Sequence, residues 1–444
     1  MKSLPRIHVA PNNHALTTEH NQPFLWLGDT AWELFHRLGR EEAQVYLADR
    51  AAKGFTVIQA VALAELDGLH TPNVYGDCPL NNDDPEQPNE PYWQYVDEVI
   101  DMAANLGLYI GLLPTWGDKM TPMWDAGPIV FTEANTAAYG EWIGQRYANR
   151  SNVLWILGGD RPPVAEIGSW GVTTDPFDHR PLWRAMATGI EQHIPDALIS
   201  YHPPGGTGSS IHLHNEAWLD VNMYQSGHGS GRDVPIWQMI THDYQLTPTK
   251  PTLDSEPNYE DHPVSPWPTW DPANGYFRDH DVHKQCYRSI LAGACGVTYG
   301  HHSIWQFYDP ATREPVNHPD CSWQAALDRP GAQHMRHLRD LFERFPLTTL
   351  VPDQQLLASS EGVGGAHIRA ARETNGHHAL VYLPESAPVT INLERLAGGA
   401  RASWFDPRSG ETQQIDGEAS GAHTFTPPAY GPDWVLVLEA DAKA

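Results

Sequence analysis

The stretch Val153-Leu-Trp-Ile-Leu-Gly-Gly-Asp160 is an apolar run that stops at two glycines and a carboxylate. A second stretch, Pro251-Thr-Leu-Asp-Ser-Glu256, repeats this arrangement later in the chain, with a shorter apolar part and another terminal carboxylate. Short apolar runs bounded by glycine and proline are typical of buried β-strands. The carboxyl ends of the strands in a parallel barrel converge on one mouth, so we expect these two carboxylates to face each other.

Short apolar runs alternate with amphipathic helical segments from residue 23 to about residue 305, the pattern of βα units around a parallel sheet. Gly54 and Gly107 follow two of the helical segments as helix stops. The predicted helices cover residues 41–53, 92–106, 136–148, 182–192 and 282–292. The predicted strands cover residues 24–27, 56–62, 108–113, 153–157, 198–201, 221–224, 252–253 and 297–299. Eight strands predict an α/β fold, a (β/α)8 TIM barrel over residues 1–346.

The character of the sequence changes after Pro346. Apolar runs at residues 366–370, 379–383, 389–393, 403–405 and 435–438 are separated by glycine, proline and Asn-Gly turns, which is typical of antiparallel strands. The stretch Trp404-Phe-Asp-Pro-Arg-Ser-Gly410 indicates a strand that runs into a tight turn. We predict a small antiparallel β-sandwich domain over residues 347–444.

The composition limits the kind of partner. The 55 acidic residues against 28 basic ones give a formal net charge of −27, which repels nucleic acid and anionic membrane surfaces. A neutral substrate fits this charge better, and the 17 Trp and 17 Tyr suit stacking on sugar rings, although most aromatic residues in any chain belong to the core. We therefore expect a neutral sugar substrate and no nucleic-acid, membrane or cofactor partner. The oligomeric state stays open.

The cysteines and the chain start bear on the cellular compartment. The 4 cysteines include no CxxC pair, so neither a disulfide framework nor a zinc knuckle is indicated. The first residues contain no apolar run of signal-peptide length, and no apolar span of about 18 residues occurs. We expect a cytoplasmic protein, or a secreted one if a signal peptide has been trimmed.

Asp160 and Glu256 are the candidate catalytic residues. Two glycines let the chain turn sharply before Asp160, and Pro257 keeps the backbone of Glu256 extended. Each carboxylate also has a simpler interpretation, Asp160 as the cap of the next helix and Glu256 as a loop carboxylate in a salt bridge. Asp254 and Glu260 are rivals for the second position. A facing pair of carboxylates is what cleavage of a glycosidic bond requires.

Other polar and aromatic residues that follow the predicted strands are candidates for substrate binding. Tyr224 is placed to donate its phenolic hydrogen to Glu256, which would hold that carboxylate ionised. Trp305 suits the floor of a sugar subsite, and Asp29 suits binding of a sugar hydroxyl. Each member of the set also has a structural alternative as a helix cap or a packed side chain. The candidate substrate-binding residues are Asp29, Trp32, Trp116, Asp118, His202, Tyr224, His228, His301, His302 and Trp305.

Two alternative functions stay open at this point. His301 and His302, together with His212-Leu-His214, suit a metal-dependent barrel hydrolase, but such enzymes carry His-x-His at the end of the first strand, where this chain has Gly28-Asp29-Thr-Ala-Trp32. We therefore expect no metal. The other alternative is a noncatalytic carbohydrate-binding protein, against which the intact carboxylates at both strand ends argue.

Four stretches together resemble a known family. They are Pro23-Phe-Leu-Trp-Leu-Gly-Asp-Thr-Ala-Trp32, Trp155-Ile-Leu-Gly-Gly-Asp160, Ser255-Glu-Pro-Asn-Tyr-Glu260 and Tyr299-Gly-His-His-Ser-Ile-Trp305, and they span the predicted barrel. The family is that of the apiosidase-like glycoside hydrolases, glycoside hydrolase family 140. The carboxyl-terminal part resembles the β-sandwich usually found behind that barrel.

The resemblance implies a retaining mechanism of the clan A type, with the acid/base after the fourth strand and the nucleophile after the seventh. By motif, Asp160 becomes the acid/base and Glu256 the nucleophile. Most clan members use Glu after the fourth strand, so an Asp must reach the leaving oxygen with a shorter side chain. The family's known activity releases the branched pentose apiose from pectic side chains. The resemblance therefore implies an exo-acting hydrolase of a terminal furanoside-type sugar in pectic oligosaccharides or small glycosides.

Overall fold

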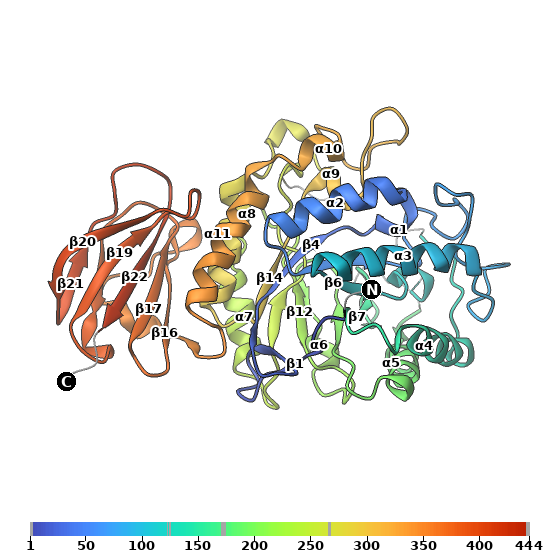
Figure 1. The fold of residues 1–444 in the computed structure, drawn as a ribbon, viewed down its shortest axis with the longest axis horizontal. Coiled ribbons are helices and arrows are strands. Elements are labelled where there is room, and N and C mark those ends of the chain that lie inside the picture. The colour runs from blue at the N-terminus through green and yellow to red at the C-terminus, as the bar shows by residue number, and fades with distance from the viewer. Residues whose placement is uncertain (1–2, 122, 124–125, 170–174, 265–267, 441–444) are drawn as a thin grey trace.

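Eight parallel strands form a barrel at the centre of the larger domain (Figure 1). The structure is a computed structural model that describes residues 3–121, 123, 126–169, 175–264 and 268–440. Successive barrel strands pair in chain order, and a parallel bridge between Ser200 and Val221 joins the fifth strand to the sixth and closes the ring. The strands are β4 (Trp26–Thr30), β5 (Val57–Val61), β6 (Tyr109–Leu113), β7 (Val153–Gly158), β10 (Ile199–His202), β12 (Asn222–Gln225), β13 (Thr252–Asp254) and β14 (Gly296–Tyr299). The predicted barrel is confirmed.

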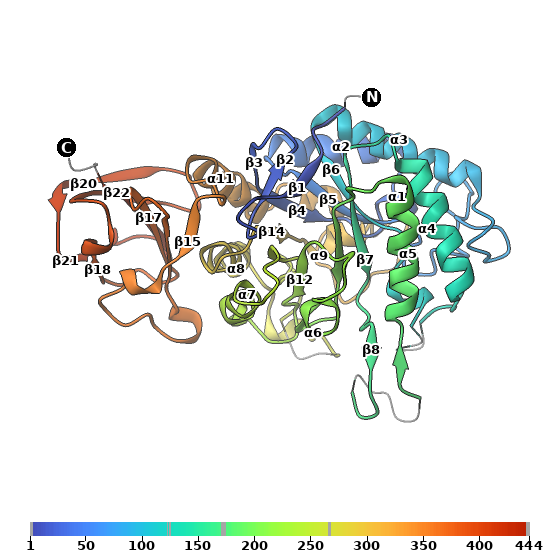
Figure 2. The same cartoon turned by 90° about the horizontal axis from the view of Figure 1, so that it is seen from below.

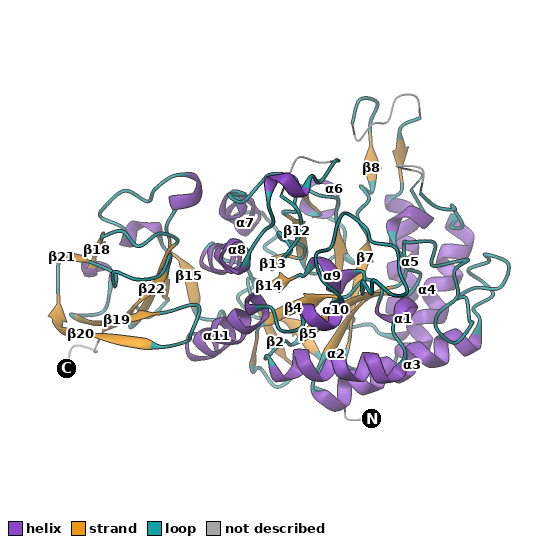
Figure 3. Ribbon diagram, turned by 90° about the horizontal axis from the view of Figure 1, so that it is seen from above, coloured by secondary structure: helices purple, strands orange, loops and turns teal. Residues whose placement is uncertain are grey.

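Helices surround the strands in the order expected of βα units (Figure 3). All five predicted helices are present with ends shifted by a few residues, and Gly107 ends α3 in the left-handed conformation, with φ 83°. The eighth barrel helix, α11, lies beyond the last helix that the sequence predicted. The helices are α1 (Leu34–Arg37), α2 (Arg40–Ala52), α3 (Glu90–Leu106), α4 (Glu133–Tyr147), α5 (Arg180–His193), α6 (Ser210–Leu213), α7 (Ile236–Tyr244), α8 (Asp279–Leu291), α9 (His302–Trp305), α10 (Trp323–Ala326) and α11 (Pro330–Arg344).

The first predicted strand, residues 24–27, covers parts of two strands. β3 (Pro23–Phe24) pairs with β2 (Leu16–Thr18), which pairs with β1 (Ile7–Val9) in a small antiparallel sheet. Side chains of this sheet share an apolar cluster with residues of the barrel interior. The barrel strand itself begins at Trp26 and continues to Thr30, so Asp29 lies within the strand and not after it. Two further short pairs leave the barrel, the hairpin of β8 (Val164–Ala165) and β9 (Phe177–Asp178), and β11 (Thr207–Gly208) beside β12.

The carboxyl-terminal domain consists of antiparallel strands, as predicted. A six-stranded sheet has the order β15-β16-β17-β22-β19-β20, and a two-stranded sheet of β18 and β21 packs across one apolar cluster with it. The first predicted run, 366–370, begins in a short 3-10 helix, and its strand starts only at Arg369. The strands are β15 (Leu350–Pro352), β16 (Arg369–Glu373), β17 (His378–Leu383), β18 (Val389–Asn392), β19 (Ala400–Phe405), β20 (Thr412–Ala419), β21 (Ala422–Phe425) and β22 (Trp434–Ala440).

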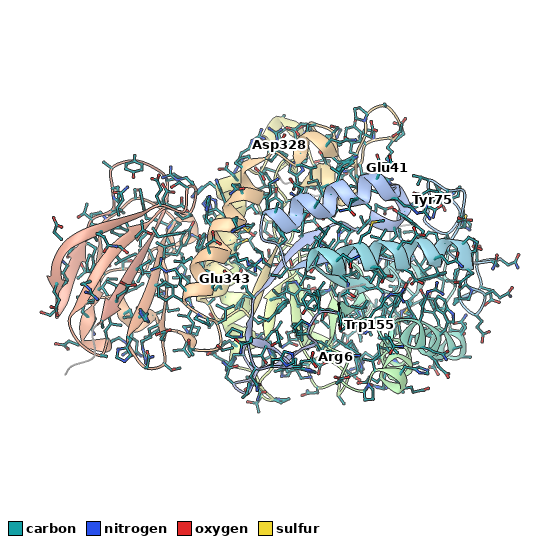
Figure 4. All side chains as sticks on the ribbon, viewed as in Figure 1. Arg6, Glu41, Tyr75, Trp155, Asp328 and Glu343 are labelled. Atoms are coloured by element: carbon teal, nitrogen blue, oxygen red, sulfur yellow. The ribbon has the colours of Figure 1, made fainter. Side chains whose placement is uncertain are left out.

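Helices α8 and α11 lie between the barrel strands and the carboxyl-terminal sheet (Figures 1 and 2). Tyr287 of α8 stacks on Tyr382 of β17, with ring centroids 5.0 Å apart. Figure 4 shows Glu41 and Glu343 on the helices of the outer layer, whereas Trp155 lies on β7 and is 1% exposed. Because one apolar cluster includes side chains of both domains, the barrel and the sheet domain share part of their core. In the part of the chain that the structure describes, no helix has the length and apolar character needed to cross a membrane.

Candidate active site

The turn after β7 presents Asp160 at the mouth of the barrel. Gly158, Gly159 and Asp160 all have positive φ angles, of 87°, 118° and 54°. A Cβ at Gly158 would collide with the carbonyl oxygen of His202, so glycine is required there. Asp is one of the few residues that adopt the left-handed conformation at modest cost. The side chain of Asp160 is 30% exposed, which leaves its carboxyl group accessible from the mouth.

Glu256 lies just past the end of β13, held between two histidines. Nε2 of His202 lies 3.1 Å from one carboxylate oxygen of Glu256, and Nε2 of His228 lies 3.2 Å from the other. The side chain of Glu256 is 8% exposed. The two histidines come from different places, the end of β10 and the loop after β12.

Backbone contacts fix the tautomer of both histidines. The backbone N–H of Asp160 donates to Nδ1 of His202 at 3.4 Å, and the backbone N–H of Tyr259 donates to Nδ1 of His228 at 3.3 Å. Each Nδ1 is an acceptor, so the proton of each neutral ring is on Nε2, the ring nitrogen nearer Glu256, and in His228 it is donated to that carboxylate. His202 therefore connects the two candidate catalytic residues, since it contacts the backbone of one and the carboxylate of the other.

The two carboxyl groups have opposite pKa shifts. Burial raises the pKa of Asp160, the charge of Arg161 lowers it, and the charge of Glu256 raises it. The resulting pKa is about 6. Burial also acts to raise the pKa of Glu256, but the contacts with His202 and His228 outweigh it and hold that pKa well below its usual range. One carboxyl group of the pair thus keeps its proton in mildly acidic solution while the other is ionised.

The pH dependence of hydrolysis should follow these two groups. If Asp160 must be protonated and Glu256 ionised, kcat/KM falls about tenfold per pH unit above pH ~6 and stays level to well below pH 4. The charge of Arg161 lowers the pKa of Asp160, so Arg161→Gln should move the alkaline limb to higher pH. Initial rates between pH 3 and pH 9 measure both effects, and an alkaline limb that does not move in this variant would contradict the assignment of Asp160.

Neither rival carboxylate lies between the two histidines as Glu256 does. Asp254 accepts hydrogen bonds from the backbone N–H and the hydroxyl of Ser226, at 3.1 and 2.7 Å, and so supports the loop after β12. Glu260 accepts from the hydroxyl of Tyr299 at 2.6 Å and from the first turn of α11. Both carboxylates are buried, and both serve to join elements of the barrel.

Tyr224 does not make the bond that the sequence led us to expect. Its hydroxyl donates to Asp243 of α7 at 3.1 Å, and its ring packs with Ile236 and Trp237 outside the barrel. Side chains alternate along a strand, so the neighbouring Gln225 points inward instead. The histidines occupy the positions around Glu256 that Tyr224 was expected to take.

Asp29 also lies away from the mouth. It is fully buried, accepts a hydrogen bond from Tyr46 at 2.5 Å, and pairs with Arg50 of α2 at 2.6 Å. We expected Asp29 to follow the first strand and to bind a sugar hydroxyl. It lies within β4 instead, with its side chain toward the helix layer.

Asp29→Ala should destabilise the barrel and leave its chemistry intact. The change leaves the buried Arg50 without its main partner, and breaking a buried ion pair in this way costs about 3–5 kcal/mol. Urea unfolding measures the loss, and the specific activity of the folded variant should match the wild type. The double variant Asp29→Leu with Arg50→Met is the control, because it removes both charges and should recover part of the stability. Full stability of Asp29→Ala would contradict this interpretation.

Two tryptophans lie beside His202, and a third shares their apolar cluster. Trp32 contacts His202 edge-on, with ring centroids 5.2 Å apart, and Trp116 lies 5.7 Å from the same imidazole. Trp305 is 8% exposed and belongs to the same apolar cluster. These positions agree with the expected ones at the strand exits, while the role of the tryptophans in binding sugar stays a prediction.

The remaining predicted site residues contact protein groups. Both carboxylate oxygens of Asp118 lie 2.8 Å from Nζ of Lys119. His301 accepts from the backbone of Ser303 through Nδ1, so its Nε2–H faces Asp261. In His302, Nδ1 accepts from Trp305 and Nε2 donates to the carbonyl of Asn317. Neither ring of this pair presents a free lone pair, which disfavours metal binding by His301 and His302.

Sequence reasoning missed three residues near the pair. Gln225 hydrogen-bonds to Asp160. Tyr259 is buried beside Glu256. The pKa of its phenol is well above the usual value, mainly because of burial and also because of the charge of Glu256. Burial and then the charges of nearby carboxylates, including Asp160, raise the pKa of Glu65 well above its usual range. Glu65 follows β5, so the rule that located the two catalytic candidates, a carboxylate after a strand, would have found it as well.

A parallel barrel whose mouth holds two carboxyl groups of opposed pKa has the architecture of a glycoside hydrolase. The chain is a glycoside hydrolase, and it belongs to the apiosidase-like family, because the model of that family, described as "Apiosidase-like, catalytic domain", matches residues 10–349. A second model, described as "Putative collagen-binding domain of a collagenase", matches residues 351–439. No curated protein matches the sequence.

Solved structures agree with this placement. One described as a glycoside hydrolase is 29% identical, with 100% of both chains covered and a TM-score of 0.86. A glycoside hydrolase family 5 structure from Bacteroides vulgatus ATCC 8482 is also 29% identical, with 99% of this chain and 93% of that one covered and a TM-score of 0.86. A family 5 mannosidase from Rhizomucor miehei, 10% identical with a TM-score of 0.50 over 78% of this chain and 98% of that one, shares the fold alone.

Proposed function

We propose that the protein is a retaining, exo-acting hydrolase that removes a terminal furanoside-type sugar, apiose or a similar pentose, from pectic oligosaccharides or small glycosides. The observation that carries the proposal is the opposed pKa of the two carboxyl groups, with Asp160 at about 6 and Glu256 held ionised by two imidazole N–H groups. A pair with these properties suits a general acid and a nucleophile. The choice of sugar rests on membership of the apiosidase-like family.

In the first step, Glu256 attacks the anomeric carbon and forms a glycosyl ester, while Asp160 transfers its proton to the departing glycosidic oxygen. In the second step, Asp160 takes a proton from water, the hydroxide attacks the anomeric carbon, and the ester bond to Glu256 breaks. The sugar leaves with its original configuration because each step inverts the anomeric carbon once. His202 and His228 hold Glu256 ionised and oriented before the first step, and they receive the carboxylate again when the ester bond breaks.

A neutral sugar is also the substrate that the charge of the chain favours. With a formal net charge of −27, the protein repels polyanions at long range, which favours neutral glycosides over pectic fragments rich in galacturonate. Trp32 and Trp116 lie beside His202, and Trp305 belongs to the same apolar cluster, so we expect their indole rings to border the sugar site. We expect these contacts to set the affinity, and the carboxyl pair to set the rate.

The test is a screen of the purified full chain with identification of products. The panel contains apiosides, arabinofuranosides and, as a control class, pyranosides, each as an aryl glycoside and as a pectic oligosaccharide where one exists. We expect release of a terminal furanose, and proton NMR of the first product should show the anomer of the substrate. Release of pyranoses alone would overturn the sugar class, and the opposite anomer would overturn the retaining mechanism. Binding without hydrolysis across the panel would support the noncatalytic alternative.

A further inference from the structure

Two histidines and an aspartate lie together where the barrel meets the carboxyl-terminal domain; His283 and Asp433 are buried, and His280 is partly buried. His280 and His283 lie three residues apart on one face of α8, and Asp433 immediately precedes β22. One ligand atom from each of the three lies within 4.8 Å of the others. The group thus combines a barrel helix with the sheet domain, and it contains none of the residues around Glu256.

The polar atoms of this group are incompletely satisfied. Asp433 and His283 are fully buried, with side-chain exposures of 0%. Among the residues that the structure describes, Oδ1 of Asp433 and Nε2 of His280 are buried without a hydrogen-bond partner. A buried polar atom without a partner is unfavourable, so two in one place indicate a missing partner that satisfies both.

We propose that His280, His283 and Asp433 bind a divalent cation of the zinc type that joins the barrel to the carboxyl-terminal domain. Two imidazoles and one carboxylate are ligands that suit Zn²⁺, with water as the fourth. Ligand atoms around a tetrahedral zinc ion are about 3.4 Å apart when the bonds are about 2.0–2.1 Å long. The present ligand atoms lie within 4.8 Å of one another, so the proposed ion would bring the more widely spaced of them closer together.

The neighbours of these three residues suit the outer shell of a metal site. Nε2 of His283 now lies 2.8 Å from Oδ2 of Asp433, and Nδ1 lies 2.9 Å from Nδ1 of His334. With its proton on Nδ1, donated to His334, His283 can give the lone pair of Nε2 to a metal that replaces the contact with Oδ2. The hydroxyl of Tyr382 donates to Oδ2 of Asp433 at 2.8 Å, which orients the carboxylate and leaves Oδ1 free. Ligating groups are usually held by such second contacts.

A second group of potential ligands, Asp261, His301 and Cys321, provides an internal comparison. Asp261 already pairs with Arg278 and with Arg329, and the latter contact is 2.6 Å long. Its charge is thus met by two guanidinium groups, and a cation there would be repelled. At Asp433 the charged neighbours that face the carboxylate are histidines, which are neutral when they bind metal.

The decisive variant is His280→Gln in the full chain, because His280 is not part of the bonds among His283, Asp433 and Tyr382 that support the fold. After removal of metals with a chelator, titration with Zn²⁺ alone should give one ion per wild-type chain and raise the Tm by several degrees. We expect His280→Gln to weaken Zn²⁺ binding at least about tenfold and to abolish the rise in Tm. Asp433→Asn should do the same, with a lower starting stability.

Cys321→Ser is the matched control, since it alters the other group of ligands and should bind Zn²⁺ as the wild type does. The proposal is overturned if the wild type binds no Zn²⁺ at micromolar concentration, if His280→Gln binds it equally well, or if Cys321→Ser loses it. Hydrolysis at low temperature should survive chelation in every case, so the outcome is independent of the proposed catalytic mechanism.

Discussion

Glu256→Gln is expected to lower kcat by a factor on the order of 10⁴ or more, while the protein stays folded and still binds the sugar. The amide is a poor nucleophile, so the glycosyl ester does not form. The Gln side chain has the same shape as Glu. Its amide NH₂, however, takes the place of one carboxylate oxygen beside an imidazole N–H, so the favourable contact with either His202 or His228 is lost. Binding of the product sugar, measured by calorimetry, should therefore change only a few-fold.

The matched control is Glu260→Gln, four residues further along the same loop. Glu260 accepts from Tyr299 and from the start of α11, so its loss should lower stability and leave kcat of the folded enzyme within a few-fold of the wild type. An unchanged rate in Glu256→Gln, or a large kcat effect in Glu260→Gln with unchanged stability, would show that the nucleophile has been assigned to the wrong residue.

Asp160→Asn should have an effect that depends on the leaving group. Natural glycosides need a proton on the departing oxygen, and loss of general acid catalysis typically costs 10²–10⁴-fold. Aryl glycosides with very acidic phenols leave unaided, so their first step should be nearly unchanged. Asn is the appropriate replacement because Asp160 has φ 54°, which Asn tolerates and Ala does not.

A small anion distinguishes this role from a structural one. Azide attacks the glycosyl ester without needing a general base, so it should accelerate turnover of the activated aryl glycoside by Asp160→Asn and yield a glycosyl azide of retained configuration. The alkaline limb near pH 6 should also disappear, because the group that titrates there is gone. Equal losses on all leaving groups, with no effect of azide, would rule out Asp160 as the acid/base.

The barrel strands could be predicted because parallel strands are buried on both faces and are therefore continuous apolar runs. The first strand was placed a few residues early for the same reason: apolar residues of β3 and β4 adjoin, and periodicity does not distinguish a barrel strand from the edge of a neighbouring sheet. Because of that error Asp29 was expected at the mouth of the barrel, whereas its side chain points toward the helix layer. Tyr224 was misassigned by one position, since its neighbour Gln225 is the residue that faces inward.

The sequence by itself determined the barrel, the antiparallel domain behind it and the two carboxylates, because burial periodicity and strand-end chemistry are local properties of the chain. The tertiary structure alone decided their protonation, since His202 and His228 reach Glu256 from two other strands and burial sets the pKa of Asp160. The same holds for the group around Asp433, which meets His283 from 150 positions along the chain. Contacts between distant segments form only when the layers pack, so the local sequence pattern does not predict them.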